Sequence, residues 1–186
     1  MNGKSLRRAF GALAAVVVGL STLLVGPAPA SAGAYDIYIS VLAPSGVIGP
    51  KVLDIANWSK DDRGPAHLWR LERTGNVANQ RWDVLSSYVP GMDNVVELRN
   101  RNSGKCLDKS MDRGDYDGAP VYQYTCSSSA NQQWHFVDVV PGSNWGWLVN
   151  VADGRCLDVR DVNFSDGAPL QVWSCKNSWN QRWNIF

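Results

Sequence analysis

The chain has 186 residues, of which 45% are hydrophobic and 19% are charged, and its formal net charge is +1. This length fits one domain of ordinary size. Basic and acidic residues alternate in short blocks, and no cluster of Lys and Arg has the density that nucleic-acid binding requires, so we do not expect a nucleic-acid partner.

Residues 1–32 have the features of a secretory signal peptide that is removed from the mature protein. Lys4, Arg7 and Arg8 precede an apolar run, and Ala30-Ser31-Ala32 forms a small-x-small cleavage signature. The apolar run is short for a membrane span of about 20 residues, which disfavours an uncleaved anchor. No later segment is long and apolar enough to cross a membrane. We therefore expect a secreted, extracellular protein without a membrane span.

Three internal repeats fill the predicted domain, residues 33–186. They cover about residues 35–86, 87–138 and 139–186. Each contains a Leu-Asp pair, at residues 53–54, 107–108 and 157–158, and an Asn-Gln-x-Trp motif, at residues 79–82, 131–134 and 180–183. Consecutive motif tryptophans are 52 and 49 residues apart. A fixed order of parts at a period of about 50 residues indicates a repeat architecture.

Between the two motifs, each repeat has a Gly/Ala/Pro turn followed by an aromatic segment, at residues 64–69, 119–124 and 168–173. The third repeat is the most complete copy, because it combines Cys156-Leu157-Asp158 with Gln171-Val172-Trp173-Ser174-Cys175. The first repeat lacks cysteines. Aligning its aromatic segment with the third places Val52 and Leu71 where the third repeat has its two cysteines.

The four cysteines are expected to form disulfides, because an even number in an exported chain is typical of a disulfide framework. Of the three possible pairings, spacing favours Cys106–Cys126 and Cys156–Cys175, which occupy equivalent points of two repeats. A structural zinc site would need close ligand pairs such as C-x2-C, and the chain has none, so we expect no metal.

The secondary structure is expected to be all-β. Apolar runs are short, as at residues 95–98, 147–149 and 170–173, and turn residues separate them. No window sustains helical periodicity. Short strands with frequent turns in three repeats predict a closed or nearly closed fold of three lobes around a pseudo-threefold axis.

The ordered motifs Cys-Leu-Asp, Gln-x-Trp-x-Cys and Asn-Gln-x-Trp resemble those of the ricin B-chain-type lectin family. The resemblance covers about residues 35–186. It implies a β-trefoil, with four strands per lobe, and up to three shallow carbohydrate sites. In that family the matched Asp accepts from sugar hydroxyls, the aromatic residue stacks on the sugar, and the Asn bonds a hydroxyl.

These residue types suit a neutral sugar. A carboxylate can accept from two adjacent hydroxyls, an amide both donates and accepts, and an aromatic ring covers the C–H face. The expected site of the third repeat comprises Asp158, Gln171, Trp173, Asn180 and Gln181. That of the second comprises Asp108, Tyr124, Asn131 and Gln132, with Tyr122 at the position of Gln171. That of the first comprises Asp54, His67, Trp69, Asn79 and Gln80.

Several residues have two readings. Gln80, Gln132 and Gln181 either contact sugar or bond backbone groups at a turn. Trp82, Trp134 and Trp183 are expected to fill the interior. The acidic residues of the loops lack the ligand order of a calcium site and are expected to be solvated; they are Asp112, Asp115, Asp117, Asp161 and Asp166.

The expected function is that of a secreted, non-catalytic lectin for galactose-type sugars or a plant polysaccharide such as xylan, without a cofactor. An alternative is a protein-binding β-trefoil such as a protease inhibitor, since a fold alone does not decide function. A glycoside hydrolase would need two carboxylates across a cleft, whereas the candidate Asp residues recur one per lobe. We expect a monomer. The sequence leaves open whether it acts alone or beside a separate enzyme or toxin subunit.

Overall fold

The computed structural model describes residues 34–139 and 144–185, and the predicted leader lies outside this part of the chain. The described residues form twelve β-strands and five single turns of 3₁₀ helix, which confirms the expected all-β fold. No helix in this part of the chain is long and apolar enough to span a membrane.

Each lobe contributes four strands. The first lobe contains β1 (Ser40–Val41), β2 (Lys51–Ile55), β3 (Ala66–Arg70) and β4 (Trp82–Ser86). The second contains β5 (Val95–Asn100), β6 (Cys106–Lys109), β7 (Ala119–Tyr124) and β8 (Gln133–Asp138). The third contains β9 (Gly146–Asn150), β10 (Cys156–Val159), β11 (Ala168–Trp173) and β12 (Trp183–Asn184). The 3₁₀ turns are η1 (Ala56–Trp58), η2 (Ala78–Gln80), η3 (Ala130–Gln132), η4 (Arg160–Val162) and η5 (Trp179–Gln181).

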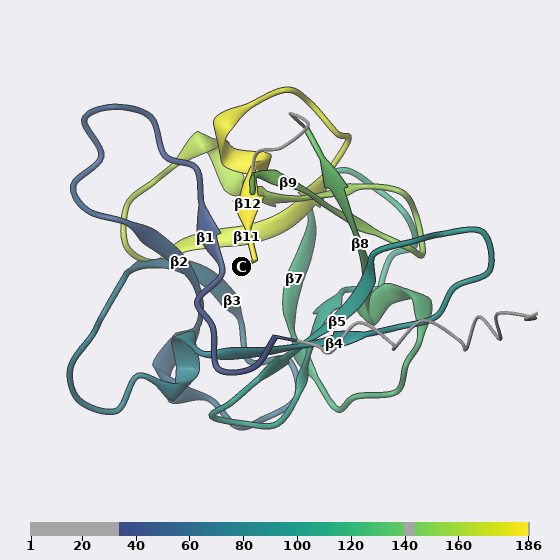
Figure 1. Cartoon of the computed structure of the whole chain (residues 1–186), viewed down its shortest axis with the longest axis horizontal. Helices are drawn as coiled ribbons and strands as arrows, with labels where there is room; N and C mark the ends of the chain where they lie inside the picture. The colour runs from purple at the N-terminus through teal and green to yellow at the C-terminus, as the bar shows by residue number, and fades with distance from the viewer. Residues whose placement is uncertain (1–33, 140–143, 186) are drawn as a thin grey trace, which may run out of the picture.

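Six strands form a closed barrel in the order β4-β5-β8-β9-β12-β1. The ring closes where Ile37 and Trp82 exchange backbone hydrogen bonds of 3.0 and 2.9 Å. In Figure 1 the three lobes follow one another around the centre of the view, where β12 lies. Closure leaves the barrel without free strand edges, which removes sites for unwanted strand pairing.

The other six strands form three hairpins, β2–β3, β6–β7 and β10–β11, which cover one end of the barrel. They touch one another through β11–β3 and β11–β7 pairing and through a bridge between Pro65 and Tyr122. The three-repeat β-trefoil predicted from the sequence is therefore the fold of the protein.

The barrel interior is organised by Trp82, Trp134 and Trp183, each fully buried. Every indole N–H donates to the carbonyl of the Leu in the Leu-Asp pair of its own lobe, at 2.9–3.1 Å. This partner matters because a buried indole N–H without an acceptor would be costly. The predicted core role of these rings is confirmed.

Both predicted disulfides are present, Cys106–Cys126 and Cys156–Cys175. Each joins the first residue of one strand of a hairpin to the chain just beyond the other strand. A loop of about 20 residues closed in this way stabilises the fold by roughly 3 kcal/mol in the chain-entropy view. In the first lobe Val52 pairs with Trp69, as Cys156 pairs with Trp173, so the alignment of Val52 with a cysteine position is correct.

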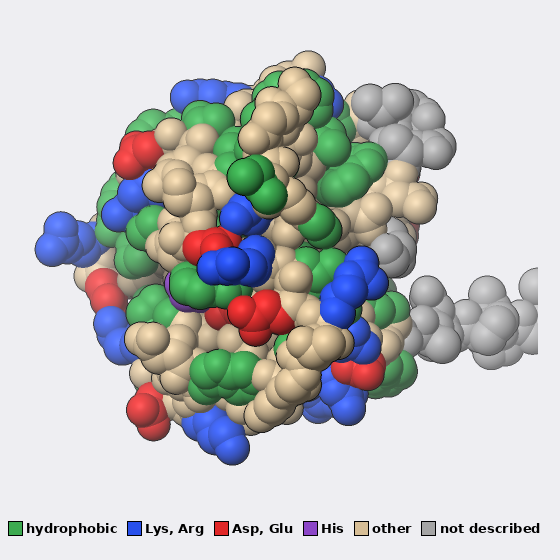
Figure 2. Space-filling model, turned by 90° about the vertical axis from the view of Figure 1, so that its left-hand side faces the viewer, with side chains coloured by type: hydrophobic (Ala, Val, Ile, Leu, Met, Phe, Trp, Pro, Cys, Tyr) green, Lys and Arg blue, Asp and Glu red, His purple; other side chains and the backbone are tan. Residues whose placement is uncertain are grey.

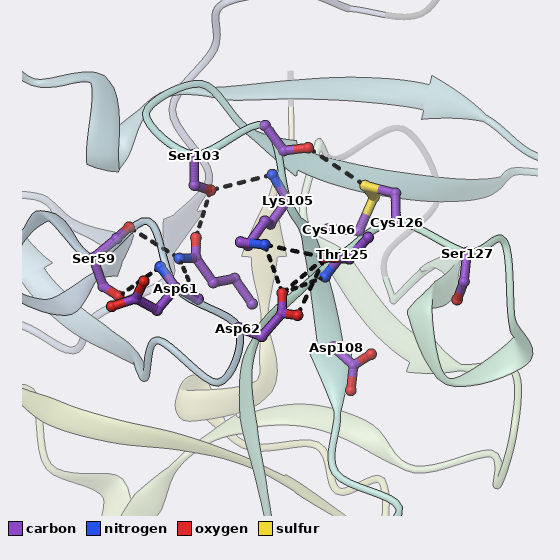
Figure 3. Close-up of polar contacts among 12 residues, drawn as sticks. Ser59, Asp61, Asp62, Ser103, Lys105, Cys106, Asp108, Thr125, Cys126 and Ser127 are labelled. Carbon is purple, nitrogen blue, oxygen red and sulfur yellow. Dashed lines mark hydrogen bonds and ion pairs between the residues drawn. A yellow bond between two sulfur atoms is a disulfide. The ribbon is translucent and has the colours of Figure 1, made fainter.

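One acidic residue in each hairpin loop binds the following lobe. Asp62 accepts from Lys105 Nζ at 2.6 Å and from the backbone N–H of Thr125 at 2.8 Å (Figure 3). Asp117 accepts from Arg155 Nε at 2.9 Å and from Ser174 N–H at 2.7 Å.

Asp166 completes the set by accepting from Lys51 Nζ at 2.6 Å and from Arg70 N–H at 2.8 Å. The lobes are thus linked in a cycle, first to second, second to third and third to first. We call these three residues the linking aspartates. The expectation that these loop residues are merely solvated is wrong for Asp117 and Asp166, because each is opposite a cation and a backbone N–H of the next lobe.

Charged side chains of both signs are mixed over the face shown in Figure 2.

A second link between lobes is buried. The side chain of Lys109 is fully inaccessible, and its Nζ lies 2.9 Å from Asp153 Oδ2 and 2.6 Å from Asp115 Oδ1. Burial alone would lower the pKa of Lys109, but the two carboxylates raise it.

Candidate carbohydrate-binding sites

The strand register of each hairpin assembles the predicted site residues. In the third lobe Asp158 of β10 lies directly opposite Gln171 of β11. Asp108 is opposite Tyr122 in the second lobe, and Asp54 is opposite His67 in the first. Since side chains two residues apart share a strand face, the platform residues Trp173, Tyr124 and Trp69 lie on the same face as these partners.

The Asn of each Asn-Gln-x-Trp motif completes the cluster. The side-chain amide of Asn180 donates to Asp158 Oδ2 at 2.7 Å, and Asn131 and Asn79 make the same contact with Asp108 and Asp54 at 3.0 and 2.9 Å. All three lobes bring together the Asp, the Asn and the aromatic residue that the sequence predicted.

The Gln of the Asn-Gln-x-Trp motif supports the neighbouring residues through hydrogen bonds of its side-chain amide. Gln132 Nε2 donates to Asp108 Oδ2 at 2.8 Å and to Thr125 O at 3.0 Å, while its Oε1 accepts from Ser127 N–H at 2.8 Å. Gln181 repeats this pattern around Asp158 and Ser174, and Gln80 bonds Arg70 O and Glu72 N–H. All three are buried and bonded on both amide atoms. Gln132 and Gln181 therefore hold both the Asp and the end of the hairpin, whereas Gln80 holds the end of the hairpin alone.

In the third lobe, the pocket of ≈ 210 Å³ is lined by Asp158, Gln171, Trp173 and Asn180, among others. Gln171 Nε2 donates to Asp158 Oδ1 at 2.9 Å, and its own Oε1 accepts from Arg160 Nε at 3.0 Å. Burial raises the pKa of Asp158, and the three amide donors around it offset only part of that rise.

The wall of this third pocket includes Asp161 and Val162. Their φ angles are 57° and 53°, in the left-handed region, where a β-branched residue is a clear outlier. Asn57 and Trp58 of the first lobe have the same conformation, with φ of 55° and 56°. In both lobes this turn leaves an apolar side chain, Val162 or Trp58, partly exposed.

In the second lobe, the pocket of ≈ 290 Å³ is lined by Asp108, Tyr122, Tyr124 and Asn131 together with rim residues. Asp108 Oδ2 accepts from both Asn131 and Gln132. Oδ1 accepts no hydrogen bond from the described residues, because Tyr122 stands where the other lobes have His67 or Gln171. Burial raises the pKa of Asp108 to about 6, although the amide donors and Arg63 act in the opposite direction.

In the first lobe, His67 is bound to two members of the site. Its Nε2 lies 2.8 Å from Asp54 Oδ1, and its ring stacks on Trp69 with centroids 5.2 Å apart. Asp54 Oδ2 is taken by Asn79. A sugar in this lobe would therefore compete with His67 both for the carboxylate and for one face of the platform.

The structure adds pocket residues that motif analysis missed. Arg63 and Asp112 line the second pocket, and Lys176 lines the third, with Nζ 5.3 Å from the centre of the Trp173 ring. Arg63 was detectable in principle, because Asp62-Arg63-Gly64-Pro65 replaces the Asp-Gly-Ala-Pro sequence of the other two repeats. It belongs to the first repeat but faces the second pocket, so assigning residues repeat by repeat conceals it.

The closed barrel, the three capping hairpins and the three Asp–Asn–aromatic clusters together define a β-trefoil protein of the lectin type. Residues 78–173 and 141–186 match the profile of the ricin-type β-trefoil lectin domain-like family. The chain belongs to this family.

Solved structures agree with this assignment. A designed threefold-symmetric protein, ThreeFoil, is 32% identical with a TM-score of 0.65, over 78% of this chain and 96% of that chain. An exo-β-1,3-galactanase from Clostridium thermocellum is 27% identical with a TM-score of 0.66, over 80% of this chain but only 30% of the enzyme. The ricin B-like lectin of Macrolepiota procera, in complex with lactose, is 16% identical with a TM-score of 0.58, over 78% of this chain and 92% of that chain, and shows the fold alone. A search of curated protein sequences finds no match.

Proposed function

We propose that the protein is a secreted, non-catalytic lectin that binds galactose-type sugars through the pockets of the second and third lobes. The observation that carries this proposal is the repeated cluster of a buried Asp, held by an Asn amide and flanked by an aromatic ring. Volumes of ≈ 290 and ≈ 210 Å³ lie at or below the lower end of the range for drug-sized ligands, which suits a single sugar residue.

The choice of galactose over xylan is supported by the likeness to a galactanase. Each shallow pocket should bind weakly on its own. Two or more pockets on one rigid body gain affinity for a polymeric or surface glycan through effective concentration. The protein would therefore bind multivalent glycans much more tightly than free sugar.

The carboxylates of the clusters are unsuited to glycoside hydrolysis. Asp108 and Asp158 belong to different pockets, with different linings, rather than facing each other across one cleft. The protein would bind carbohydrate without cleaving it, either alone or together with a separate enzyme or toxin subunit. The likeness to a 30% portion of a galactanase favours the role of a module that accompanies an enzyme.

Titration calorimetry with galactose, lactose, xylose and xylobiose tests the proposal. Galactose and lactose should bind to wild type, and Asp108→Ala and Asp158→Ala should each remove one component of the binding. Binding of xylobiose in preference to lactose would overturn the choice of sugar. No binding of any of these sugars, with an intact fold by circular dichroism, would favour the protein-binding alternative. Release of reducing sugar from galactan would refute the non-catalytic part.

A further inference from the structure

The second pocket has a wall that comes from the first lobe. Arg63 lies in the loop between η1 and β3, and this loop is pinned to β7 of the second lobe by two backbone hydrogen bonds. Arg63 N–H donates to Gln123 O at 2.8 Å, and Gln123 N–H donates to Gly64 O at 2.9 Å. Gln123 adds side-chain bonds to Ser59 O and Asp61 O. The loop is therefore fixed relative to the pocket that it borders.

The side chain of Arg63 extends across that pocket. Its guanidinium carbon is 5.5 Å from the centre of the Tyr122 ring. Nη1 and Nη2 each lie 2.7 Å from an oxygen of Asp112, on the loop that follows β6. Arg63 and Asp112 therefore form a fork-to-fork pair at the rim, the arrangement that orients a guanidinium most firmly. Nε–H and the outer N–H groups of Arg63 are not used in this pair.

The other two lobes have glycine at the position of Arg63. These residues are Gly118, which borders the third pocket, and Gly167, which borders the site residues of the first lobe. A Cβ built on Gly118 would lie 3.8 Å from both Gln171 Oε1 and the ring of Trp173, and one on Gly167 would lie 3.8 Å from Trp69. Each loop thus faces the binding cluster of the next lobe, and of these three positions only Arg63 carries a side chain.

The conformation at these positions is also equivalent. The φ angles are 67° at Arg63, 96° at Gly118 and 84° at Gly167. Left-handed φ costs an arginine conformational energy that a glycine would not incur. An outlier of this kind beside a binding cluster is a reason to look for a function in the side chain.

The second pocket therefore combines an open oxygen on its Asp with an arginine from the preceding lobe, a pair that the third pocket lacks. Asp108 Oδ1 is open because Tyr122 does not donate to it, whereas Asp158 Oδ1 is taken by Gln171. Arg63 provides unused N–H groups in the same pocket. At the position equivalent to Asp112 the third pocket has the apolar Val162.

We propose that Arg63 is the specificity-determining residue of the second pocket. It donates a hydrogen bond to one sugar oxygen while the neighbouring hydroxyl donates to Asp108 Oδ1. The second pocket would then require an oxygen substituent at a position where the third pocket, with Gly118 and Val162, requires none. This inference deepens the proposed function and rests on it.

A ligand-by-variant cycle tests the proposal. The second pocket is isolated by the near-isosteric substitutions Asp54→Asn and Asp158→Asn. This protein and its Arg63→Gly derivative are titrated, by calorimetry and by NMR, with methyl galactoside and with each of its monodeoxy derivatives. Arg63→Gly should fold normally, because glycine accepts the left-handed φ at that position.

With Arg63 present, removal of one particular hydroxyl should weaken binding by about tenfold, which is the scale of a lost hydrogen bond to a charged group. With Arg63→Gly that difference should disappear, while the loss caused by the hydroxyl that contacts Asp108 should remain. Arg63→Lys should restore only part of the discrimination, because it lacks the planar fork. A merely structural role would lower all affinities alike and leave the pattern among deoxy sugars unchanged.

The outcomes separate the two proposals. If wild type binds no sugar, the proposed function fails and this inference with it. If wild type binds but the isolated second pocket does not, the proposed function stands for the third pocket alone and the inference is overturned. An identical deoxy pattern with and without Arg63 also overturns it. As a positive counterpart, Gly118→Arg with Val162→Asp should give the third pocket, isolated by Asp54→Asn and Asp108→Asn, the same sensitivity.

Discussion

Asp166 Oδ1 lies 2.6 Å from Lys51 Nζ, so a loop near the end of the chain is joined to the first strand of the first hairpin. Both side chains are mostly buried, with exposed fractions of 22% and 9%. Burial would raise the pKa of Asp166, but Lys51 and the N–H of Arg70 lower it. Asp166 is therefore ionised at neutral pH, and its contact with Lys51 completes the cycle of the linking aspartates.

Asp166→Ala should destabilise the fold by about 1–3 kcal/mol, the range for leaving a buried donor without its partner. Urea unfolding at pH 7, followed by Trp fluorescence, measures the change. Since the folded-state pKa of Asp166 lies below the unfolded value, this contribution is present above about pH 4 and is lost as the pH falls through the folded pKa. Asp93→Asn, at an exposed position between β4 and β5, should have little effect, and equal losses in both variants would contradict the assignment.

Lys109→Ala should be at least as damaging, by about 3 kcal/mol, the lower end of the range for breaking a buried pair, because Arg155 Nη1 remains 3.3 Å from the buried Asp153. The same urea experiment applies, with the exposed Lys60→Ala as control. Asp115→Ala should cost much less, because Asp115 is half exposed. A loss below 1 kcal/mol for Lys109→Ala would show that the buried pair contributes little to stability.

Sugar binding by the second pocket should depend on pH between 5 and 7. The pKa of Asp108 in the free protein is raised to about 6, and a protonated carboxyl is a poorer acceptor for a sugar hydroxyl. If only the ionised form binds, affinity should fall about tenfold from pH 7 to pH 5. Calorimetry on the Asp54→Asn, Asp158→Asn protein measures this fall, and constant affinity over the range would exclude a role for the Asp108 carboxylate.

The free energy of unfolding of the free protein should change with pH in the opposite direction to the sugar affinity, again because of Asp108. Between about pH 3.8 and pH 6, the Asp108 carboxyl is protonated in the folded state but ionised in the unfolded state. Lowering the pH through this window therefore adds stability. Asp108→Asn should remove this contribution, which a comparison of urea midpoints at pH 7 and pH 5 would detect.

His67→Ala should improve binding by the first-lobe cluster of Asp54, Trp69 and Asn79, because it frees Asp54 Oδ1 and uncovers one face of Trp69. The measurement is a lactose titration of a protein in which Asp108→Asn and Asp158→Asn silence the other two pockets. His135→Ala, which changes the only other histidine in the sequence, serves as the control. A decrease on His67→Ala would instead show that His67 itself contacts the sugar.

The fold was predictable because its signals repeat. Trp82, Trp134 and Trp183 occur at near-constant spacing, and a ring of this size recurring in a polar motif indicates an interior position. The two disulfides followed from the equivalence of cysteine positions. The pairing of each Asp with its Asn was also within reach, since both residues recur in every repeat.

What the sequence could not show is how each pocket is completed. His67, Tyr122 and Gln171 occupy one position, and whether such a side chain occupies or frees the carboxylate depends on its length and on its hydrogen-bond partners. Lys109 is charged yet fully buried, contrary to the ordinary tendency of lysine. Arg63 and the linking aspartates act on the lobe that follows their own, and no pattern confined to a single repeat contains that information.

The loop position held by Arg63, Gly118 and Gly167 affects the ligand preference of the following repeat rather than of its own. A substitution in one repeat changes the chemistry of the site that the next repeat carries. When relatives are compared repeat against repeat, the hairpin-loop residue should therefore be grouped with the following site. Duplication of one repeat in place of another would preserve each Asp–Asn–aromatic cluster, yet it would reassign selectivity by giving a cluster a new neighbour.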